Sequence, residues 1–261
     1  MRLQELPIVV ISLVFSFGIL HAKPVQPDKK KDEPKKAAAF KPVDINNALT
    51  ENDPNDPKIG NPAKQYTVKL QKDKTYVIDL VSKDFDAYLR LLDKGGNQLA
   101  EDDDSGGDLN SRIIHSSDKD AEYTIVVTSF DGQVGKFNLK MREFALKAEA
   151  KARDVPKDGF GITDQINQNN VSDIGKLGRL YSFNFKAGVT YTIDLESGTM
   201  DSYLYLFDGK SKLLAQDDDS GGDLNSRLSF RPDRDGVFHI LASTLDGEET
   251  GEFTLKVRAE K

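Results

Sequence analysis

The sequence contains no cysteine and no tryptophan, and it has only three histidines among its 261 residues. Without cysteine there can be no disulfide framework, no thiolate zinc site and no lipid-modified cysteine behind a signal peptide. Each domain must therefore be stable through its hydrophobic core alone. The lack of tryptophan, together with tyrosines that mostly occupy inward-facing positions of the expected strands, also disfavours a platform for stacking sugars.

Positive charge is in short supply and unevenly distributed. The chain has 36 Lys and Arg against 43 Asp and Glu, a formal net charge of −7. Residues 23–45 hold seven lysines and four acidic residues, net +3, which leaves −10 for the rest of the chain. An acidic body disfavours a nucleic-acid partner, because phosphate binding needs a basic face.

Long hydrophobic runs are also scarce, and the one present covers residues 7–20. These fourteen residues, followed by His21-Ala22, are fewer than the ~20 that a membrane-spanning helix needs. The run and the small residue after it predict a signal peptide over residues 1–22, with an uncleaved anchor as the alternative. We therefore expect a protein that is secreted or held in the periplasm or cell envelope, without a membrane span after cleavage.

The segment 23–44 is rich in lysine and proline, and Phe40 is its only aromatic residue. Such a composition cannot bury enough apolar surface to fold, so we expect a disordered segment. It would act as a solvated spacer or, alternatively, as a tether to anionic envelope polymers.

An internal duplication organises the remainder. The eleven residues from Asp102 to Arg112 recur unchanged from Asp217 to Arg227, and the match extends outward at a constant offset until one residue is inserted in the second copy. A repeat of about 100 residues has the size of an independent domain. We expect a first domain over residues 45–146, a linker over 147–160 and a second domain over 161–261.

Within each copy the apolar residues alternate with polar ones at a period of two. Short strands with this pattern, separated by Gly-, Asp- and Asn-rich turns, predict an all-β fold of two tandem antiparallel β-sandwiches, jelly-roll-like in architecture. Residues 142–154 alone have strong helix propensity, and we expect a strand there to run into a linker with partial helix.

Several motifs make each copy similar to a known family. The first copy has Asn52-Asp53-Pro54, then Tyr76-Val77-Ile78-Asp79-Leu80, Phe85-Asp86-Ala87-Tyr88-Leu89 and the closing Gly135-Lys136-Phe137-Asn138-Leu139. The second copy repeats most of these, but lacks the Asn-Asp-Pro motif and has a Gln/Asn-rich stretch over 164–170 instead. The copies resemble the bacterial pre-peptidase C-terminal (PPC) domain, a small β-sandwich often appended to exported proteins. No peptidase domain accompanies them, which departs from the arrangement that named the family.

The resemblance implies a non-catalytic exported binding or adhesion protein. Two linked modules would raise the effective affinity for a repetitive extracellular protein or polysaccharide. Two other classes remain open: a metal-assisted hydrolase that uses the Asp-rich loops as acid and base, and a purely structural envelope spacer.

Asp104-Ser105-Gly106-Gly107 looks like the surroundings of a serine-protease nucleophile, but that mechanism needs a histidine to accept the serine proton. His115 is replaced by Phe230 in the second copy, and His239 by Thr124 in the first. No histidine is common to both copies although the serine is, so we predict no catalytic residues.

The repeated loop is the candidate metal site. It is not an EF-hand, since Ile113 stands where a bidentate Glu is required. Clustered carboxylates with two glycines nevertheless favour a looser Ca²⁺ site, because a hard cation with oxygen ligands relieves the repulsion between them. The expected ligands are Asp102, Asp103, Asp104, Asp108, Asn110, Asp217, Asp218, Asp219, Asp223 and Asn225, with Asp86 and Asp201 as contributors if the preceding strand abuts the loop.

The alternative is a solvated hairpin turn, for which Asp, Ser, Gly and Asn are the usual residues, with Arg112 and Arg227 neutralising the charge. The loop is unchanged between copies whereas neighbouring segments differ freely. That contrast favours the ion, although a recent duplication would leave the same identity.

Overall fold

The computed structural model describes residues 40–147 and 151–260. The predicted signal peptide, and the predicted disordered segment up to residue 39, lie outside the described residues. In the described ranges there is no helix long and apolar enough to cross a membrane.

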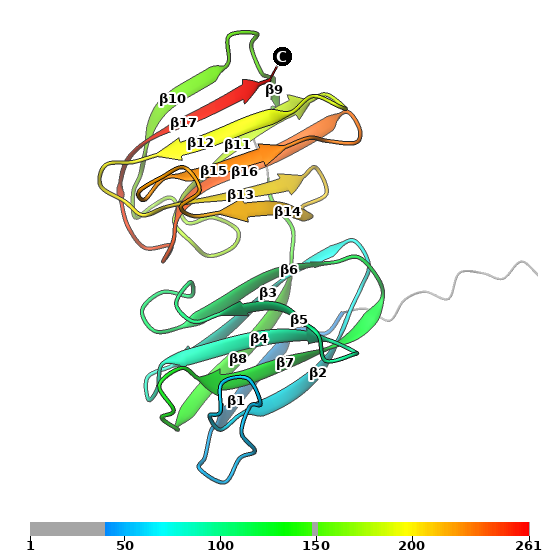
Figure 1. Cartoon of the computed structure of the whole chain (residues 1–261), viewed down its shortest axis with the longest axis vertical. Helices are drawn as coiled ribbons and strands as arrows, with labels where there is room; N and C mark the ends of the chain where they lie inside the picture. The colour runs from blue at the N-terminus through cyan, green and yellow to red at the C-terminus, as the bar shows by residue number, and fades with distance from the viewer. Residues whose placement is uncertain (1–39, 148–150, 261) are drawn as a thin grey trace, which may run out of the picture. The chain divides into compact units, whose positions relative to one another are not determined.

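All regular elements within the described residues are β-strands, in two sets that follow the sequence duplication (Figure 1). The first set is β1 (Val43–Ala48), β2 (Lys64–Leu70), β3 (Lys74–Ser82), β4 (Ala87–Asp93), β5 (Gln98–Asp102), β6 (Ser111–Ser117), β7 (Ala121–Ser129) and β8 (Lys136–Phe144). The second set is β9 (Arg153–Asp154), β10 (Phe160–Ile166), β11 (Gly178–Phe185), β12 (Tyr191–Glu196), β13 (Ser202–Asp208), β14 (Leu213–Asp217), β15 (Ser226–Phe230), β16 (Gly236–Thr244) and β17 (Gly251–Ala259).

Each set forms a jelly roll, which confirms the predicted fold class. The first copy has sheets of order β1-β8-β3-β6 and β2-β7-β4-β5. The second repeats this as β10-β17-β12-β15 and β14-β13-β16-β11, with the short β9 added to the edge in parallel. Strand pairing is otherwise antiparallel, and this order of eight strands in two sheets is the double Greek key.

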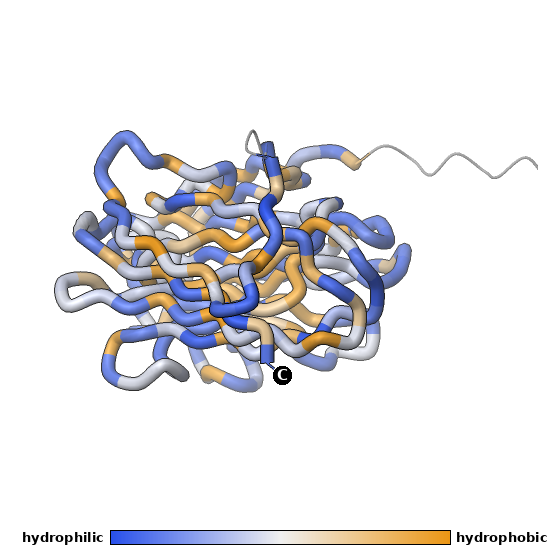
Figure 2. The backbone as a smooth tube through the Cα atoms, turned by 90° about the horizontal axis from the view of Figure 1, so that it is seen from above, coloured by the Kyte–Doolittle hydropathy of each residue, from blue (hydrophilic) through white to orange (hydrophobic). Residues whose placement is uncertain are grey.

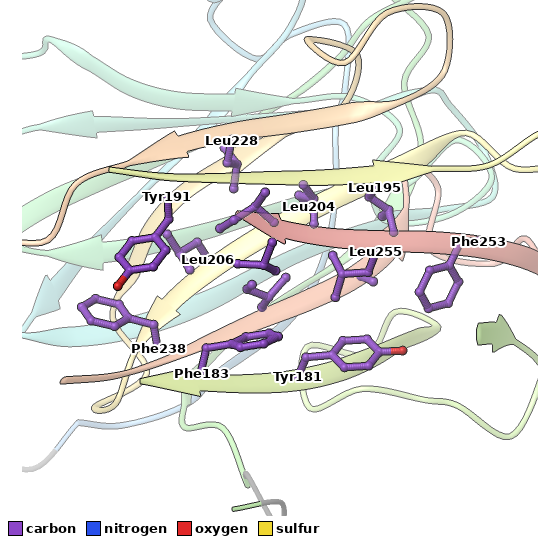
Figure 3. Close-up of a cluster of buried hydrophobic side chains, with 14 of the residues drawn as sticks. Tyr181, Phe183, Tyr191, Leu195, Leu204, Leu206, Leu228, Phe238, Phe253 and Leu255 are labelled. Carbon is purple, nitrogen blue, oxygen red and sulfur yellow. The ribbon is translucent and has the colours of Figure 1, made fainter. Parts of the chain in front are cut away.

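The alternation of apolar residues places a core between the two sheets of each sandwich. Figure 3 shows this for the second copy, where Phe183, Leu206 and Leu255 meet from three strands. Tyr76, Leu89 and Leu139 belong to the corresponding core of the first copy. Figure 2 shows hydrophobic stretches along the strands and hydrophilic ones at many of the turns between them. Period-two burial is what a sheet with one covered face requires.

The structure corrects two predictions at the segment boundaries. Residues 43–48 form β1, which pairs with β8, so residues 43 and 44 belong to a strand and not to the expected disordered segment. Phe40 also packs on the core, with its ring 5.0 Å from that of Tyr76. The described part of 142–154 contains the end of β8 and the short β9 but no helix, because pairing with β3 extends the strand to Phe144.

The two sandwiches belong to one compact unit and share a buried apolar cluster. Val77 and Phe144 come from the first copy, and Tyr205, Phe207 and Leu241 from the second. The Phe144 and Phe207 rings lie 5.5 Å apart. Tyr205 therefore faces the other sandwich and not its own core.

Hydrogen bonds frame this cluster. Thr75 Oγ1 donates to Ser211 O at 2.7 Å, and Leu146 N donates to Ser211 Oγ at 2.8 Å. Leu213 N donates to Ser116 Oγ at 2.8 Å, and Lys212 forms an ion pair with Asp118. Apolar burial bordered by directional bonds fixes one sandwich against the other.

Candidate functional site

The repeated loop connects β5 to β6 in the first sandwich and β14 to β15 in the second. Most of its invariant residues prove to have structural roles. Asp102 Oδ2 accepts hydrogen bonds from Ser105 N at 3.1 Å and Arg112 N at 2.7 Å. Asp217 Oδ2 accepts the same pair, from Ser220 N and Arg227 N, at the same distances. The first carboxylate of each loop thus ties the two ends of the loop together.

Asn110 closes the loop from its other side. Its Nδ2 donates to Gly107 O at 2.8 Å, and its Oδ1 accepts from Ser82 N at 3.0 Å. A Cβ on Gly106 would stand 2.5 Å from Asn110 O, so that position has no room for a side chain. Gly107 and Asp108 have φ of +90° and +51°, in the left-handed region where Gly is preferred and Asp is tolerated.

Arg112 and Arg227, which end the two copies of the loop, form ion pairs with residues outside it. Arg112 Nε donates to Asp79 Oδ1 on the adjacent strand β3 at 2.5 Å, and Arg227 Nε donates to Asp194 Oδ1 on β12 at 2.5 Å. They pair with the Asp of the Tyr-x-Ile-Asp-Leu motif and do not neutralise the loop. This overturns the role expected for them in a metal-free turn.

Asp103 and Asp104 are left without such a role. Neither side chain has a hydrogen-bond or ion-pair partner among the described residues. Asp86, just before β4, joins them, and its buried Oδ1 has no hydrogen-bond partner in that part of the chain. Burial, followed by the charges of Asp104, Asp131 and Asp103, raises the pKa of Asp86. Burial and the charge of Asp103 likewise raise the pKa of Asp104.

The second copy repeats the cluster. Burial raises the pKa of Asp201, and the charges of Glu249, Asp218, Asp219 and Asp246 add to the increase. None of these carboxylates forms a salt bridge with a described Lys or Arg.

The structure therefore divides the predicted ligand set. Asp86 lies near Asp103 and Asp104. The other side chains hydrogen-bond to the loop backbone and close the loop, namely those of Asp102, Asn110, Asp217 and Asn225. The exposed Asp108 and Asp223 take left-handed backbone conformations in the loop.

Sequence reasoning missed Asp131, Asp246 and Glu249, which lie in the Asp-Gly turns after β7 and β16. The alignment of Phe130-Asp131-Gly132 with Leu245-Asp246-Gly247 was the available signal, but it indicated only a turn.

Carboxylate oxygens that repel one another, with one buried and unpartnered, fit a hard cation such as Ca²⁺. No three described His, Cys, Asp or Glu residues are already arranged around a metal position. An ion would have to draw Asp86, Asp103 and Asp104 together by side-chain rotation.

Neither Ser105 nor Ser220 forms a hydrogen bond with a described histidine. Ser105 Oγ donates to Asp102 and to Arg112 O. The His115 ring lies against Tyr123 with centroids 5.7 Å apart, and His239 Nδ1 hydrogen-bonds to Ser182 Oγ at 2.9 Å. Both histidines serve as strand residues in these contacts.

The two identical loops have different surroundings. The first faces the second sandwich, where the buried Lys176 places its Nζ 2.6 Å from Leu245 O and 5.3 Å from the Tyr203 ring centroid. Burial lowers the pKa of Lys176 to about 8, and the charge of Asp102 opposes that decrease. Lys176 corresponds to Asn61 in the first copy, whose Nδ2 donates to the equivalent carbonyl, Phe130 O.

Part of the second sandwich matches a known protein family. Residues 178–244 match the bacterial pre-peptidase C-terminal domain. The match runs from the start of β11 to the end of β16, and thus includes the second repeated loop. The internal repeat places residues 63–129, from β2 to β7, on the same segment. No curated protein sequence matches the chain.

Among solved structures, the chain is similar to the CUB1-EGF-CUB2 domain of human MASP-1/3, with 11% identity and a TM-score of 0.27, over 83% of this chain and 99% of that one. It is also similar to the M60 catalytic domain with CBM51-1 and CBM51-2 from Clostridium perfringens ZmpB, with 7% identity and a TM-score of 0.25, over 75% of this chain and 33% of that one.

Proposed function

We propose that the protein is a non-catalytic exported binding protein, in which two jelly-roll sandwiches act as one rigid body toward an extracellular protein or polysaccharide. The PPC match to residues 178–244 supports a binding module. The apolar run over residues 7–20 supports export. Fixing the sandwiches through the Phe144–Phe207 contact holds both acidic loops in one orientation, which lowers the entropy cost of engaging a ligand at two points.

The observation that carries the proposal is a set of four carboxylates repeated position by position. Asp86, Asp103, Asp104 and Asp131 have their counterparts in the second copy, and no carboxylate of either set forms a salt bridge with a described Lys or Arg. Uncompensated charge costs folding free energy, so its retention in both copies is explained by a ligand. We propose that Ca²⁺ binds at each cluster and stabilises it.

Thermal unfolding of the full-length protein in chelator, calcium and magnesium tests the calcium sites. For a dissociation constant on the order of 1 mM, ~10 mM calcium adds about 1.4 kcal/mol for each site. Magnesium should add less, because it gives up its waters reluctantly. Asp86→Asn and Asp201→Asn should each remove one increment, whereas Asp158→Asn, at an exposed position, should remove none. Equal melting temperatures in chelator and calcium would refute the sites.

Binding is tested separately, by measuring retention of a panel of extracellular proteins and polysaccharides on the immobilised full-length protein. Turnover of a bound substrate that Ser105→Ala or the carboxylate variants abolish would contradict the non-catalytic assignment.

A further inference from the structure

A pocket of about 480 Å³ lies beside the first acidic loop, and the second sandwich supplies part of its wall. The first sandwich contributes Tyr88, Asp103, Asp104 and Phe130, and the second contributes Tyr203 and Asp218. Both repeated loops and three aromatic side chains therefore share one hollow.

The pocket is lined by carboxylates and by no described lysine or arginine. Glu101 is already paired with Lys58 and hydrogen-bonded to Tyr88, and Asp102 is occupied by the backbone of its own loop. Asp103, Asp104 and Asp218 remain without a cationic partner among the described residues. The net character of the lining is thus strongly negative.

The aromatic rings give this negative pocket apolar surfaces. Phe130 is 55% exposed, and its ring centroid lies 5.9 Å from that of Tyr88. An exposed aromatic beside unpaired carboxylates is a combination that attracts organic cations, because the ring face and the carboxylate both favour positive charge.

Two residues that line the pocket, Tyr203 and Leu245, also contact the ammonium group of the buried Lys176. Lys176 Nζ donates to Leu245 O at 2.6 Å and lies 5.3 Å from the Tyr203 ring centroid, and both residues also line the pocket. The charge of Asp102 favours the ionised form of Lys176. The protein itself therefore uses a carbonyl, a tyrosine face and a carboxylate of this wall to hold a lysine.

We propose that the pocket binds lysine or arginine side chains of a basic segment in a partner protein. This inference rests on the proposed binding function and specifies its partner. Long basic side chains suit the site because their aliphatic stems can pack on Phe130 and Leu245 while their charged ends reach Asp104 and Asp218. An aminated sugar carries its ammonium directly on the ring and has no such stem. The net charge of −10 outside residues 23–45 and the signal region draws basic partners from a distance.

Fluorescence anisotropy of labelled hexalysine with the full-length protein tests the proposal, in buffer with chelator so that calcium has no part in the result. Asp104→Asn combined with Asp218→Asn should weaken binding about tenfold, because two unpaired charges are lost from the contact. The matched control, Asp158→Asn combined with Asp233→Asn, removes the same charge at exposed positions and should change the dissociation constant less than twofold. Phe130→Ala, which leaves the charge unchanged, should weaken binding by about threefold.

Three results would overturn the proposal: no binding of hexalysine, an equal loss in the control pair, which would indicate diffuse attraction to an acidic body, or tighter binding of a glucosamine hexamer than of hexalysine. These three results do not affect the calcium-dependent unfolding of the protein. The proposed pocket for basic side chains and the proposed calcium sites can therefore be refuted separately.

Discussion

Lys176 offers a quantitative test of how tightly the two sandwiches pack. Its side chain is 1% exposed, and burial lowers its pKa from 10.5 to about 8. The unfolded chain therefore binds more protons than the folded one between about pH 8 and 10.5, so the free energy of unfolding must rise with pH in that window. We predict that Lys176→Met abolishes this contribution, because methionine fills similar space and does not titrate.

The size of the effect follows from the shift. At ~1.4 kcal/mol for each pKa unit, ionised Lys176 costs the folded state about 3 kcal/mol at neutral pH, and most of this should be regained between pH 7 and pH 10. The charges that face Lys176 are Asp102 and Asp246, which raise its pKa, and Arg112, which lowers it. Wild type and variant both contain these three residues, so the comparison isolates Lys176 itself.

The assay is urea unfolding of wild type and variant at pH 7 and pH 10, with the difference in unfolding free energy taken at each pH. Lys210→Met, at an exposed position, is the control for the chemical change. From pH 7 to pH 10, we expect the wild type to gain about 2 to 3 kcal/mol of stability relative to Lys176→Met and to gain nothing relative to Lys210→Met. A difference that stays constant to within about 0.5 kcal/mol would refute a buried, ionised Lys176 at the interface.

Three further predictions concern the loops and the chain ends. Gly106→Ala should lower stability by about 1–3 kcal/mol in chemical denaturation, because its Cβ would meet Asn110 O at 2.5 Å, whereas Gly161→Ala, with no atom within 4 Å, should not. Removal of residues 1–39 should preserve cooperative unfolding by calorimetry, whereas removal through Ala48 should lower the melting temperature, since β8 then loses its partner β1; equal melting of both truncations would contradict this. Ser105→Ala with Ser220→Ala should abolish no hydrolysis and no labelling by a serine-reactive probe, because neither serine contacts a described histidine.

Strand content could be predicted because it rests on a local alternation of apolar residues, and the two sandwiches because the sequence repeats. Leu204 and Leu206 enter their own core at a period of two, as expected for a strand with one buried face. The same strand carries Tyr205 and Phe207 on its other face, and these pack against the first sandwich. A pattern that is apolar on both faces does not identify what covers the second face, so the contact between sandwiches could not be predicted.

The repeated loop shows a second limit of the sequence. Identity over eleven residues was interpreted as a ligand set, but it has two causes. Asp102, Gly106 and Asn110 are required for the backbone path, whereas Asp103 and Asp104 are not. Only hydrogen-bond geometry separates the two groups. Asp131, far away in sequence, joins the second group through the pairing of β4 with β7.

The contact between the sandwiches joins different sheets of two homologous units, and this has a consequence for assembly. Val77 and Phe144 lie on the sheet β1-β8-β3-β6, whereas Tyr205 and Phe207 lie on the sheet that contains β13. A head-to-tail contact of this kind leaves one complementary face free at each end, and identical repeats would polymerise without limit.

The substitutions between the copies remove both free faces. Thr192 and Glu260 replace Val77 and Phe144 in the second copy, and Thr192 Oγ1 donates to Glu260 Oε1 at 2.8 Å. In the first copy Arg90 replaces Tyr205 and pairs with the buried Asp56 at 2.5 Å. Polar groups thus replace the apolar contact residues on both outer faces, which disfavours the addition of further copies, as capping repeats do in a solenoid.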